Sequence, residues 1–158
     1  MIIEDDLTGD AIIAFLREHL DDMRSISPPE SSHALDLDGL RAADVTFWTL
    51  WEAGQLLGCG ALKELDSKTG EIKSMRTAPA HRGKGVGSKL LEHIITEARR
   101  RGYTWLYLET GSMVEFAPAR ALYAKYGFGY RAPFGSYRED PNSVFMEKAL
   151  DVFAGSPP

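Results

Sequence analysis

Cysteine, long apolar segments and excess positive charge are all scarce in this chain, and each shortage excludes a class of protein. Cys59 is the only cysteine, so no intrachain disulfide can form. No run of about 18 apolar residues occurs, so we expect no transmembrane helix and no membrane partner. The first residues, MIIEDDLTGD, are acidic where a secretory signal would be basic. Together these features predict a cytoplasmic protein.

The net charge of −5 argues against nucleic acid as a partner, but the charge is unevenly distributed. Residues 1–44 hold eleven acidic and three basic side chains, whereas residues 73–101 hold eight basic and two acidic ones. Either both segments are ordinary solvated faces, or they form a site that holds a polyanion on one side and meets a cation on the other. The length of 158 residues suits one domain, which we place at residues 1–151, with a flexible tail over 152–158.

Hydrophobic periodicity predicts an α/β protein built around one mixed sheet. The clearest helix begins near Val86, because apolar residues recur at three- and four-residue steps as far as Ala98 and Gly102 ends the pattern. Residues 52–55 are typical of a hairpin turn between two strands. The expected strands are 1–7, 45–51, 56–66, 71–77, 103–110 and 143–150, and the expected helices begin at Gly9 and span 35–43, 86–101 and 118–126.

The segment HRGKGVG, residues 81–87, combines three alternating glycines with two cations immediately before that helix. A helix N-terminus presents unpaired N–H groups and a partial positive charge. Glycine leaves these N–H groups uncovered and allows the positive φ values that an anion cradle needs. Arg82 and Lys84 can add charge-assisted hydrogen bonds to phosphate oxygens. The segment therefore favours a diphosphate-binding site.

The spacing of the glycines excludes two common phosphate-binding motifs. A P-loop requires Ser or Thr after its Gly-Lys pair, but Gly85 follows Lys84 here, and no glycine lies five residues before Gly83. A dinucleotide-binding fingerprint requires G-x-G-x-x-G in the first crossover of a parallel sheet, whereas this G-x-G-x-G follows a predicted antiparallel run. The alternative to a diphosphate site is a helix N-terminus whose glycines only permit close packing.

Residues 82–87, RGKGVG, resemble the R/Q-x-x-G-x-G/A signature of the GCN5-related N-acetyltransferase (GNAT) superfamily. MRTAPAHRGKGVGSKLL resembles that family's strand, loop and helix, and ALYAKYGF at 121–128 resembles its later L-Y-x-x-x-G-F segment. The stretches GCGALKELD, GEIKSMRT, LETGSM and EDPNSVFM are similar to the bacterial YsnE-like subgroup. The resemblance implies an α/β fold with a mixed, mostly antiparallel central sheet, splayed parallel strands, and helices on both faces.

The same resemblance implies an N-acetyltransferase that moves an acetyl group from acetyl-CoA directly to a primary amine of a small molecule or a protein, without a metal. In the family, the backbone of the strand before the glycine loop binds the pantetheine arm and polarises the thioester carbonyl, and the loop binds the diphosphate. The residues that would bind acetyl-CoA here are Met75, Arg76, Thr77, Arg82, Gly83, Lys84, Gly85, Val86, Gly87 and Ser88.

Tyr123 matches the family tyrosine that supplies a proton to the coenzyme A thiolate; its alternative role is to cover the core. The base that takes the proton of the amine has two candidates, since Glu71 and Glu109 match positions that different family members use, and a chain of waters is the alternative. His33 and His81 are weaker candidates. If either glutamate is the base, a phenol and a carboxylate would divide the proton transfers.

One position departs from the family pattern. Phe116 stands seven residues before Tyr123, where the family often has an asparagine that binds the pantetheine arm. Either another group, such as Ser112, makes that hydrogen bond, or the contact is apolar. His19 and His93 are expected on helix surfaces.

The family places its acceptor site between the first helix pair and the loops near the last strands, which here are residues 19–38 and 130–143. Phe134, Tyr137 and Asn142 are candidate wall residues. The acidic first third could steer a cationic amine toward the site. The alternative function is a non-catalytic acyl-CoA-binding sensor, and a homodimer is possible by analogy with relatives. The acceptor, the acyl chain and the oligomeric state stay open.

Overall fold

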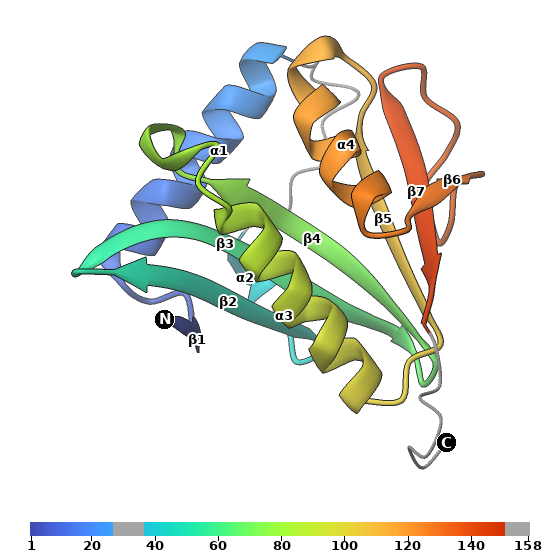
Figure 1. The fold of residues 1–158 in the computed structure, drawn as a ribbon, viewed down its shortest axis with the longest axis horizontal. Helices are drawn as coiled ribbons and strands as arrows, with labels where there is room; N and C mark the ends of the chain where they lie inside the picture. Colours follow the sequence, from blue (N-terminus) through green and yellow to red (C-terminus); the bar gives the residue numbers. More distant parts are fainter. Residues whose placement is uncertain (27–36, 151–158) are drawn as a thin grey trace.

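A computed structural model of the chain describes residues 1–26 and 37–150, in which a seven-stranded sheet carries helices on both faces (Figure 1). The sheet order is β1-β2-β3-β4-β5-β7-β6. The elements are β1 (Ile2–Glu4), α1 (Asp10–Ile26), α2 (Leu37–Leu40), β2 (Val45–Glu52), β3 (Gln55–Asp66), β4 (Thr69–Thr77), η2 (Pro79–His81), α3 (Val86–Arg100), β5 (Trp105–Gly111), η3 (Val114–Phe116), α4 (Ala117–Lys125), β6 (Gly129–Arg131) and β7 (Ser143–Ala149).

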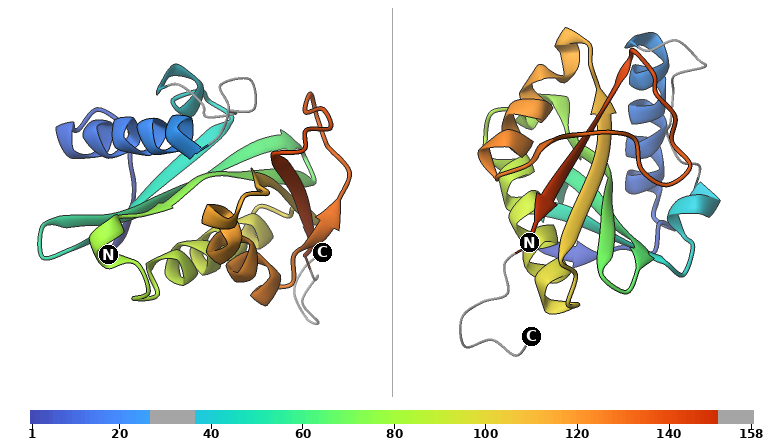
Figure 2. Two further views of the ribbon diagram at one scale, coloured as in Figure 1. Left: turned by 90° about the horizontal axis from the view of Figure 1, so that it is seen from above. Right: turned by 90° about the vertical axis from the view of Figure 1, so that its right-hand side faces the viewer.

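The helices form two layers on opposite sides of the sheet. In Figure 2, α1 and α2 cover one face, which we call the α1 face, and α3 and α4 cover the other, which we call the α3 face. The pair of β4 and β5 is parallel, and the other pairings of the described strands are antiparallel. The predicted fold class is therefore confirmed. No helix in the described ranges has the length and apolar character needed to span a bilayer.

The α3 face holds the larger core. Helix α3 begins at Val86, as its periodicity predicts, and its apolar stripe as far as Ala98 is at most 5% exposed. This stripe packs against side chains of the central strands, including Leu62, Leu106 and Leu108. A smaller cluster on the α1 face joins helix α1 to strands β2 and β3 through Ile12, Phe15, Phe47, Cys59 and Ala61. Apolar burial of this kind holds the sheet rigid between its two layers.

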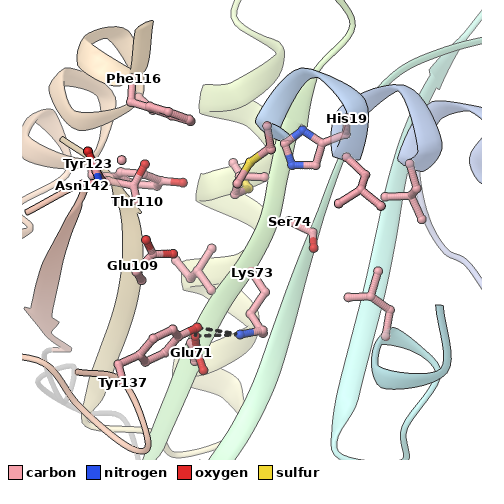
Figure 3. A pocket seen from close by; sticks show the side chains of 18 residues that line it. His19, Glu71, Lys73, Ser74, Glu109, Thr110, Phe116, Tyr123, Tyr137 and Asn142 are labelled. Carbon is pink, nitrogen blue, oxygen red and sulfur yellow. Dashed lines mark hydrogen bonds and ion pairs between the residues drawn. The ribbon is translucent and has the colours of Figure 1, made fainter. Parts of the chain in front are cut away.

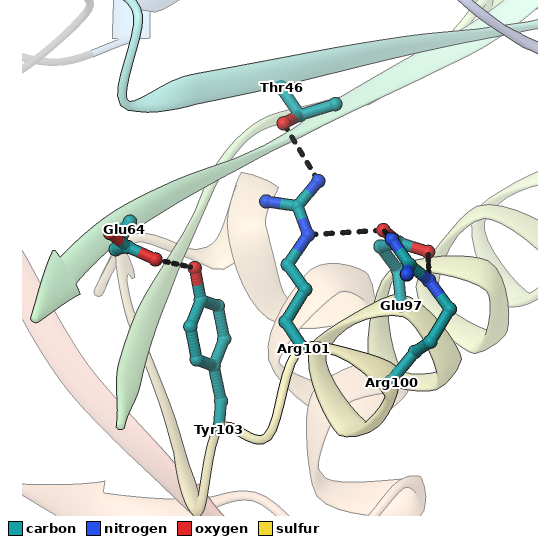
Figure 4. Close-up of polar contacts among 6 residues, drawn as sticks. All are labelled: Thr46, Glu64, Glu97, Arg100, Arg101 and Tyr103. Carbon is teal, nitrogen blue, oxygen red and sulfur yellow. Dashed lines mark hydrogen bonds and ion pairs between the residues drawn. The ribbon is translucent and has the colours of Figure 1, made fainter. Parts of the chain in front are cut away.

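Polar contacts fasten the turn between α3 and β5 (Figure 4). The Glu97 carboxylate accepts hydrogen bonds from Arg100 and Arg101, and Arg101 also donates to Thr46 on strand β2. The Tyr103 hydroxyl donates to Glu64 at 2.7 Å. The Tyr103 N–H donates to the Ala98 carbonyl at the end of α3, so β5 begins at Trp105 rather than at residue 103, where the sequence places its start.

The remaining differences from the predicted elements are short. Strand β6 and the two single-turn helices η2 and η3 were not expected, because three-residue elements show no periodicity. The hairpin turn at residues 52–55 is found as predicted, with Ala53 and Gly54 at φ values of 49° and 77°. Of the helix expected at 35–43, residues 37–40 are helical.

Candidate active site

The site begins where β4 and β5 part. Their parallel ladder pairs Thr69 to Ile72 with Trp105 to Leu108 and contains no further pair among the described residues. β5 continues to Gly111 on the ladder with β7, while β4 continues to Thr77 on the ladder with β3. The facing edges of the two strands are therefore left to other partners, which is the geometry that accepts an extended ligand.

A bulge in β4 lies at the same level. Cys59 pairs with Arg76 and Ala61 with Lys73, so Gly60 alone faces Ser74 and Met75. Ser74 adopts a φ of 55°, which is unusual for a residue other than glycine. The extra residue reverses the alternation of the strand, so that Lys73 and Arg76, three positions apart, both face the α1 layer.

A pocket passes through the sheet between the parted strands, and Figure 3 shows its lining side chains. Helices α1 and α2 contribute from one face, and η3 and α4 contribute from the other. The pocket thus connects the two layers at one point of the sheet. Its lining residues are Leu16, His19, Leu20, Met23, Leu40, Glu71, Ile72, Lys73, Ser74, Met75, Glu109, Thr110, Gly111, Phe116, Ala119, Tyr123, Tyr137 and Asn142.

Three polar side chains form a closed cluster in this pocket, which we call the Glu71 cluster: Glu71, Lys73 and Tyr137. The Lys73 ammonium donates to Glu71 Oε2 at 2.8 Å and to the Tyr137 hydroxyl at 3.0 Å. The Tyr137 hydroxyl donates to the same Oε2 at 2.7 Å. The side chains of Lys73 and Glu71 are only 10% and 4% exposed. Burial and the neighbouring Glu71 carboxylate raise the pKa of Tyr137, so its phenol remains protonated.

Tyr123 and Glu109 face the pocket beside this cluster (Figure 3). Tyr123 is 6% exposed and packs edge-on against Phe128, with ring centroids 5.7 Å apart. Burial, and then the negative charge of Glu109, raise the pKa of Tyr123 well above that of free tyrosine. A phenol in this state is protonated near pH 7 and presents its O–H to the pocket as a hydrogen-bond donor.

The Arg76 side chain does not point along the sheet edge but crosses to helix α1. It is 8% exposed, lies 3.0 Å from an Asp22 oxygen and 3.4 Å from a Glu18 oxygen, and contacts His19 Nδ1 at 3.2 Å. Its guanidinium also stacks over the Phe15 ring at 5.3 Å. Of the predicted acetyl-CoA residues, Arg76 could therefore act through its backbone only.

The expectation that His19 lies on a helix surface is wrong, because His19 lines the pocket. Burial, followed by the charge of Arg76, lowers the pKa of His19 to about 4. The imidazole is therefore neutral near pH 7, and it accepts the Arg76 hydrogen bond at Nδ1. His93 packs edge-on against Trp48, away from this pocket.

The glycine loop leads from the end of β4 to the start of α3. Gly83 and Gly85 have φ values of 78° and 81°, with no other group within 4 Å of where a side chain would begin. Gly85 is the N-cap of α3 and makes no side-chain capping bond. Arg82 and Lys84 are exposed, whereas the Val86 side chain is buried in the core and could contribute only its backbone. The loop therefore presents open backbone N–H groups flanked by two cations.

Phe116 lines the pocket with its ring directly over Gly111, where a Cβ would lie 2.2 Å from the ring. The Ser112 hydroxyl donates to the Pro141 carbonyl at 2.6 Å. This geometry favours an apolar contact at Phe116 over a replacement hydrogen bond from Ser112. Phe134 is not among the lining residues; it packs behind Tyr137 with ring centroids 5.0 Å apart.

Sequence reasoning missed Lys73. Its signal is the spacing Glu71-x-Lys73 in a strand, which places both side chains on one face and allows an ion pair. The segment 28–33, proposed as part of the acceptor wall together with the candidate base His33, lies outside the described residues.

The fold and the pocket define a class of protein: the chain belongs to the acetyltransferase (GNAT) family, whose model matches residues 12–128. The uncharacterized N-acetyltransferase YsnE of Bacillus subtilis is 58% identical over 146 residues, which cover 92% of this chain and 97% of YsnE. A Klebsiella pneumoniae protein described as an acyl-CoA N-acyltransferase is 33% identical, with a TM-score of 0.76 and coverage of 96% and 97%.

A more distant structure shares the fold. The GNAT family acetyltransferase from Elizabethkingia anophelis, solved with acetyl-CoA bound, is 20% identical, with a TM-score of 0.67 and coverage of 95% of this chain and 97% of its own. Together with the family match, the YsnE relative confirms the predicted family, its YsnE-like subgroup and an acetyltransferase activity.

Proposed function

We propose that this enzyme transfers the acetyl group of acetyl-CoA directly to a primary amine of a small molecule or a protein. The observation that carries the proposal is the pocket through the sheet at the point where β4 leaves β5. Acetyl-CoA can enter this pocket from the α3 face and the amine can enter it from the α1 face, so the two substrates can come into contact inside the sheet. Tyr123 and Glu109 lie together in that passage (Figure 3).

The donor side is built from backbone. The open edge of β4 beyond Ile72 fits an extended pantetheine arm as an added strand, and Met75 extends the pocket lining toward the glycine loop. The N–H groups at Gly83 to Ser88, with Arg82 and Lys84 beside them, fit the diphosphate. Backbone N–H groups near the Ser74 bulge can polarise the thioester carbonyl.

The side chains of the pocket supply the proton transfers. The reaction forms a nitrogen–carbon bond and breaks the carbon–sulfur bond, so the amine must lose one proton and the leaving thiolate must gain one. Tyr123, which its raised pKa keeps protonated near pH 7, hydrogen-bonds to the leaving sulfur and passes a proton to it as the carbon–sulfur bond breaks. The proton that the amine loses replaces the one that Tyr123 gives, so no tyrosinate accumulates. Glu109 takes the proton of the amine, directly or through water.

We assign the base to Glu109 rather than to Glu71. The Glu71 carboxylate already accepts two hydrogen bonds at one oxygen, from an ammonium and from a phenol, and its side chain is 4% exposed. Both bonds hold Oε2 in the Glu71 cluster, so this oxygen is already engaged with protein groups. Glu109 is half-buried, so it stays in contact with the pocket and with water.

Release of free coenzyme A tests this function. Purified protein would be incubated with acetyl-CoA and a panel of primary amines, with the binding of acetyl-CoA measured separately by calorimetry. We expect turnover with at least one amine, and loss of turnover in Glu109→Gln with unchanged acetyl-CoA binding. Tight binding of acetyl-CoA without turnover on any amine would instead establish the acyl-CoA sensor.

A further inference from the structure

We propose that the amine acceptor carries a neutral group that both donates and accepts hydrogen bonds, a carboxamide or a hydroxyl, and that the Glu71 cluster recognises this group. The inference rests on the proposed acetyl transfer and names the acceptor class for the same pocket. The resemblance to known acetyltransferases makes Glu71 a candidate base. Its contacts with Lys73 and Tyr137 favour a different role, in which Glu71 accepts a hydrogen bond from the amine substrate and Lys73 donates one to it.

Among the described residues, one N–H of Lys73 and one oxygen of Glu71 have no hydrogen bond to a protein group. An ammonium has three N–H donors, and Lys73 uses one on Glu71 and one on Tyr137. Both bonds to Glu71 end at Oε2, and among the described residues no hydrogen bond reaches Oε1. Both side chains line the pocket and are at least nine-tenths buried. A ligand that fills this part of the pocket displaces water from these two atoms, so a ligand that bonds to both is favoured over one that bonds to neither.

The charges of the pocket decide which ligand fits. Glu71 and Lys73 cancel, Tyr137 and His19 are neutral near pH 7, and Glu109 adds one negative charge. A carboxylate on the acceptor would gain Lys73 but would face Glu71 on the adjacent side and Glu109 in the same pocket. A plain alkyl group would leave the Lys73 donor and Glu71 Oε1 unpaired. A carboxamide or hydroxyl satisfies both atoms without adding charge.

The remaining lining favours the same arrangement. Tyr137 is held against Phe134 and Phe145, with ring centroids 5.0 and 5.5 Å away, so its hydroxyl has little freedom to move. The cluster therefore presents a fixed donor–acceptor pattern, which discriminates among ligands better than a mobile one does. Glu109 lies between the cluster and Tyr123 in Figure 3, so an acceptor bound at the cluster extends its amine toward the base.

Matched acceptors test the proposal. Amines of the same chain length would be compared as the carboxamide, the alcohol, the carboxylate and the plain alkyl compound, over chains of two to five carbons. The kcat/KM of each would be corrected for its fraction of unprotonated amine. At the best chain length we expect the carboxamide or the alcohol to exceed both the alkyl compound and the carboxylate by roughly tenfold or more. A preference for the carboxylate or for the alkyl amine would overturn the proposal.

Glu71→Gln then tests the role of charge, because this variant is expected to use one acceptor better than the wild type does. With Gln at this position the cluster has a net positive charge, so the carboxylate acceptor should improve relative to the carboxamide by roughly tenfold. An unchanged ratio would overturn the proposal. A folded variant with no turnover on any amine would also overturn it, since Glu71 would then take the proton of the amine.

Lys73→Met and Lys68→Met form a matched pair, because Lys68 is exposed at the turn between β3 and β4. We expect Lys73→Met to abolish most of the preference over the alkyl amine and to leave the KM for acetyl-CoA unchanged, while Lys68→Met changes neither. If Lys73→Met does not fold, the ratio in Glu71→Gln decides. Absence of coenzyme A release with every amine in the wild type would instead refute the acetyl transfer itself.

Discussion

The proposed donor side and the proposed acceptor side of the pocket differ in construction, since one consists mainly of backbone and the other mainly of side chains. The donor side consists of backbone: two glycines at positive φ, an uncapped helix N-terminus and an open strand edge. The acceptor side consists of buried charged and aromatic side chains from distant parts of the chain, such as Glu71 and Tyr137. Backbone recognises what every acyl-CoA shares, whereas side chains distinguish one amine from another. The following changes test that division.

Tyr123→Phe should have the largest effect, because Tyr123 lies where the two sides meet. Loss of a general acid lowers kcat by about 10²-fold or more, and the KM for acetyl-CoA should change little since the contacts of the donor backbone remain. Steady-state kinetics of coenzyme A release measure both. Tyr126→Phe removes a hydroxyl that donates to Glu92 on helix α3, so it is the control and should retain activity. Equal losses in both variants would contradict the assignment.

Gly85→Val should weaken the binding of coenzyme A without changing the residues that line the proposed amine site. Valine at a φ of 81° is strained, and its side chain would cover the N–H groups at the start of α3. We expect the affinity for coenzyme A in calorimetry to fall by roughly tenfold or more. Gly54→Val is the matched control, because Gly54 has a φ of 77° and open surroundings in the β2–β3 turn. If both variants bind coenzyme A equally well, the loop is only a helix cap.

His19 gives the acceptor side a pH dependence. Its pKa is lowered from the ordinary 6.5 to about 4 in the fold, so the unfolded chain binds a proton that the folded chain does not. His19 therefore does not lower the free energy of unfolding above pH 6.5. As the pH falls from 6.5 toward 4, proton uptake by the unfolded chain lowers that free energy by about 1–3 kcal/mol. Urea unfolding of the wild type and His19→Gln at a series of pH values should show this loss in the wild type only.

Arg76→Met sharpens the same measurement. Removing the Arg76 charge deletes one cause of the lowered pKa but leaves burial in place. The pKa of His19, followed by NMR, should therefore rise part of the way toward its ordinary value. A pKa that stays near 4 would mean that Arg76 has no electrostatic role at this position.

Glu97→Gln should have the smallest effect, because its contacts belong to neither side of the pocket (Figure 4). Hydrogen bonds from Arg100, and then from Arg101, lower the pKa of Glu97 to about 2. The stabilisation is present above pH 4.5 and disappears as the pH falls toward 2. We expect the Tm to fall by about 1–2 °C at pH 7 and by clearly less at pH 2, where about half of the Glu97 carboxyls are protonated, with Glu115→Gln as an exposed control. A shift that persists in full at pH 2 would exclude this ion pair as its cause.

The division also explains how much the sequence could predict. Some elements depend only on neighbours within a few residues, so local patterns predict them. These are the helix from Val86 to Ala98, the hairpin turn at 52–55 and the glycine loop. The Tyr137–Glu71 bond joins residues 66 positions apart, and no local pattern encodes it. The Arg76 side chain points to α1 because Ser74 has a positive φ, and a serine at this position does not predict a positive φ.

The added residue at Ser74 fixes which side chains of β4 face each layer. Ile72, Met75 and Thr77 face the α3 layer, and Glu71, Lys73 and Arg76 face the α1 layer, where we propose that the amine binds. Substitutions at the second set can therefore change the acceptor while the first set stays intact. The preference for an amine can therefore change through residues on one face of β4, while the residues on its other face, beside the proposed acyl-donor site, are retained.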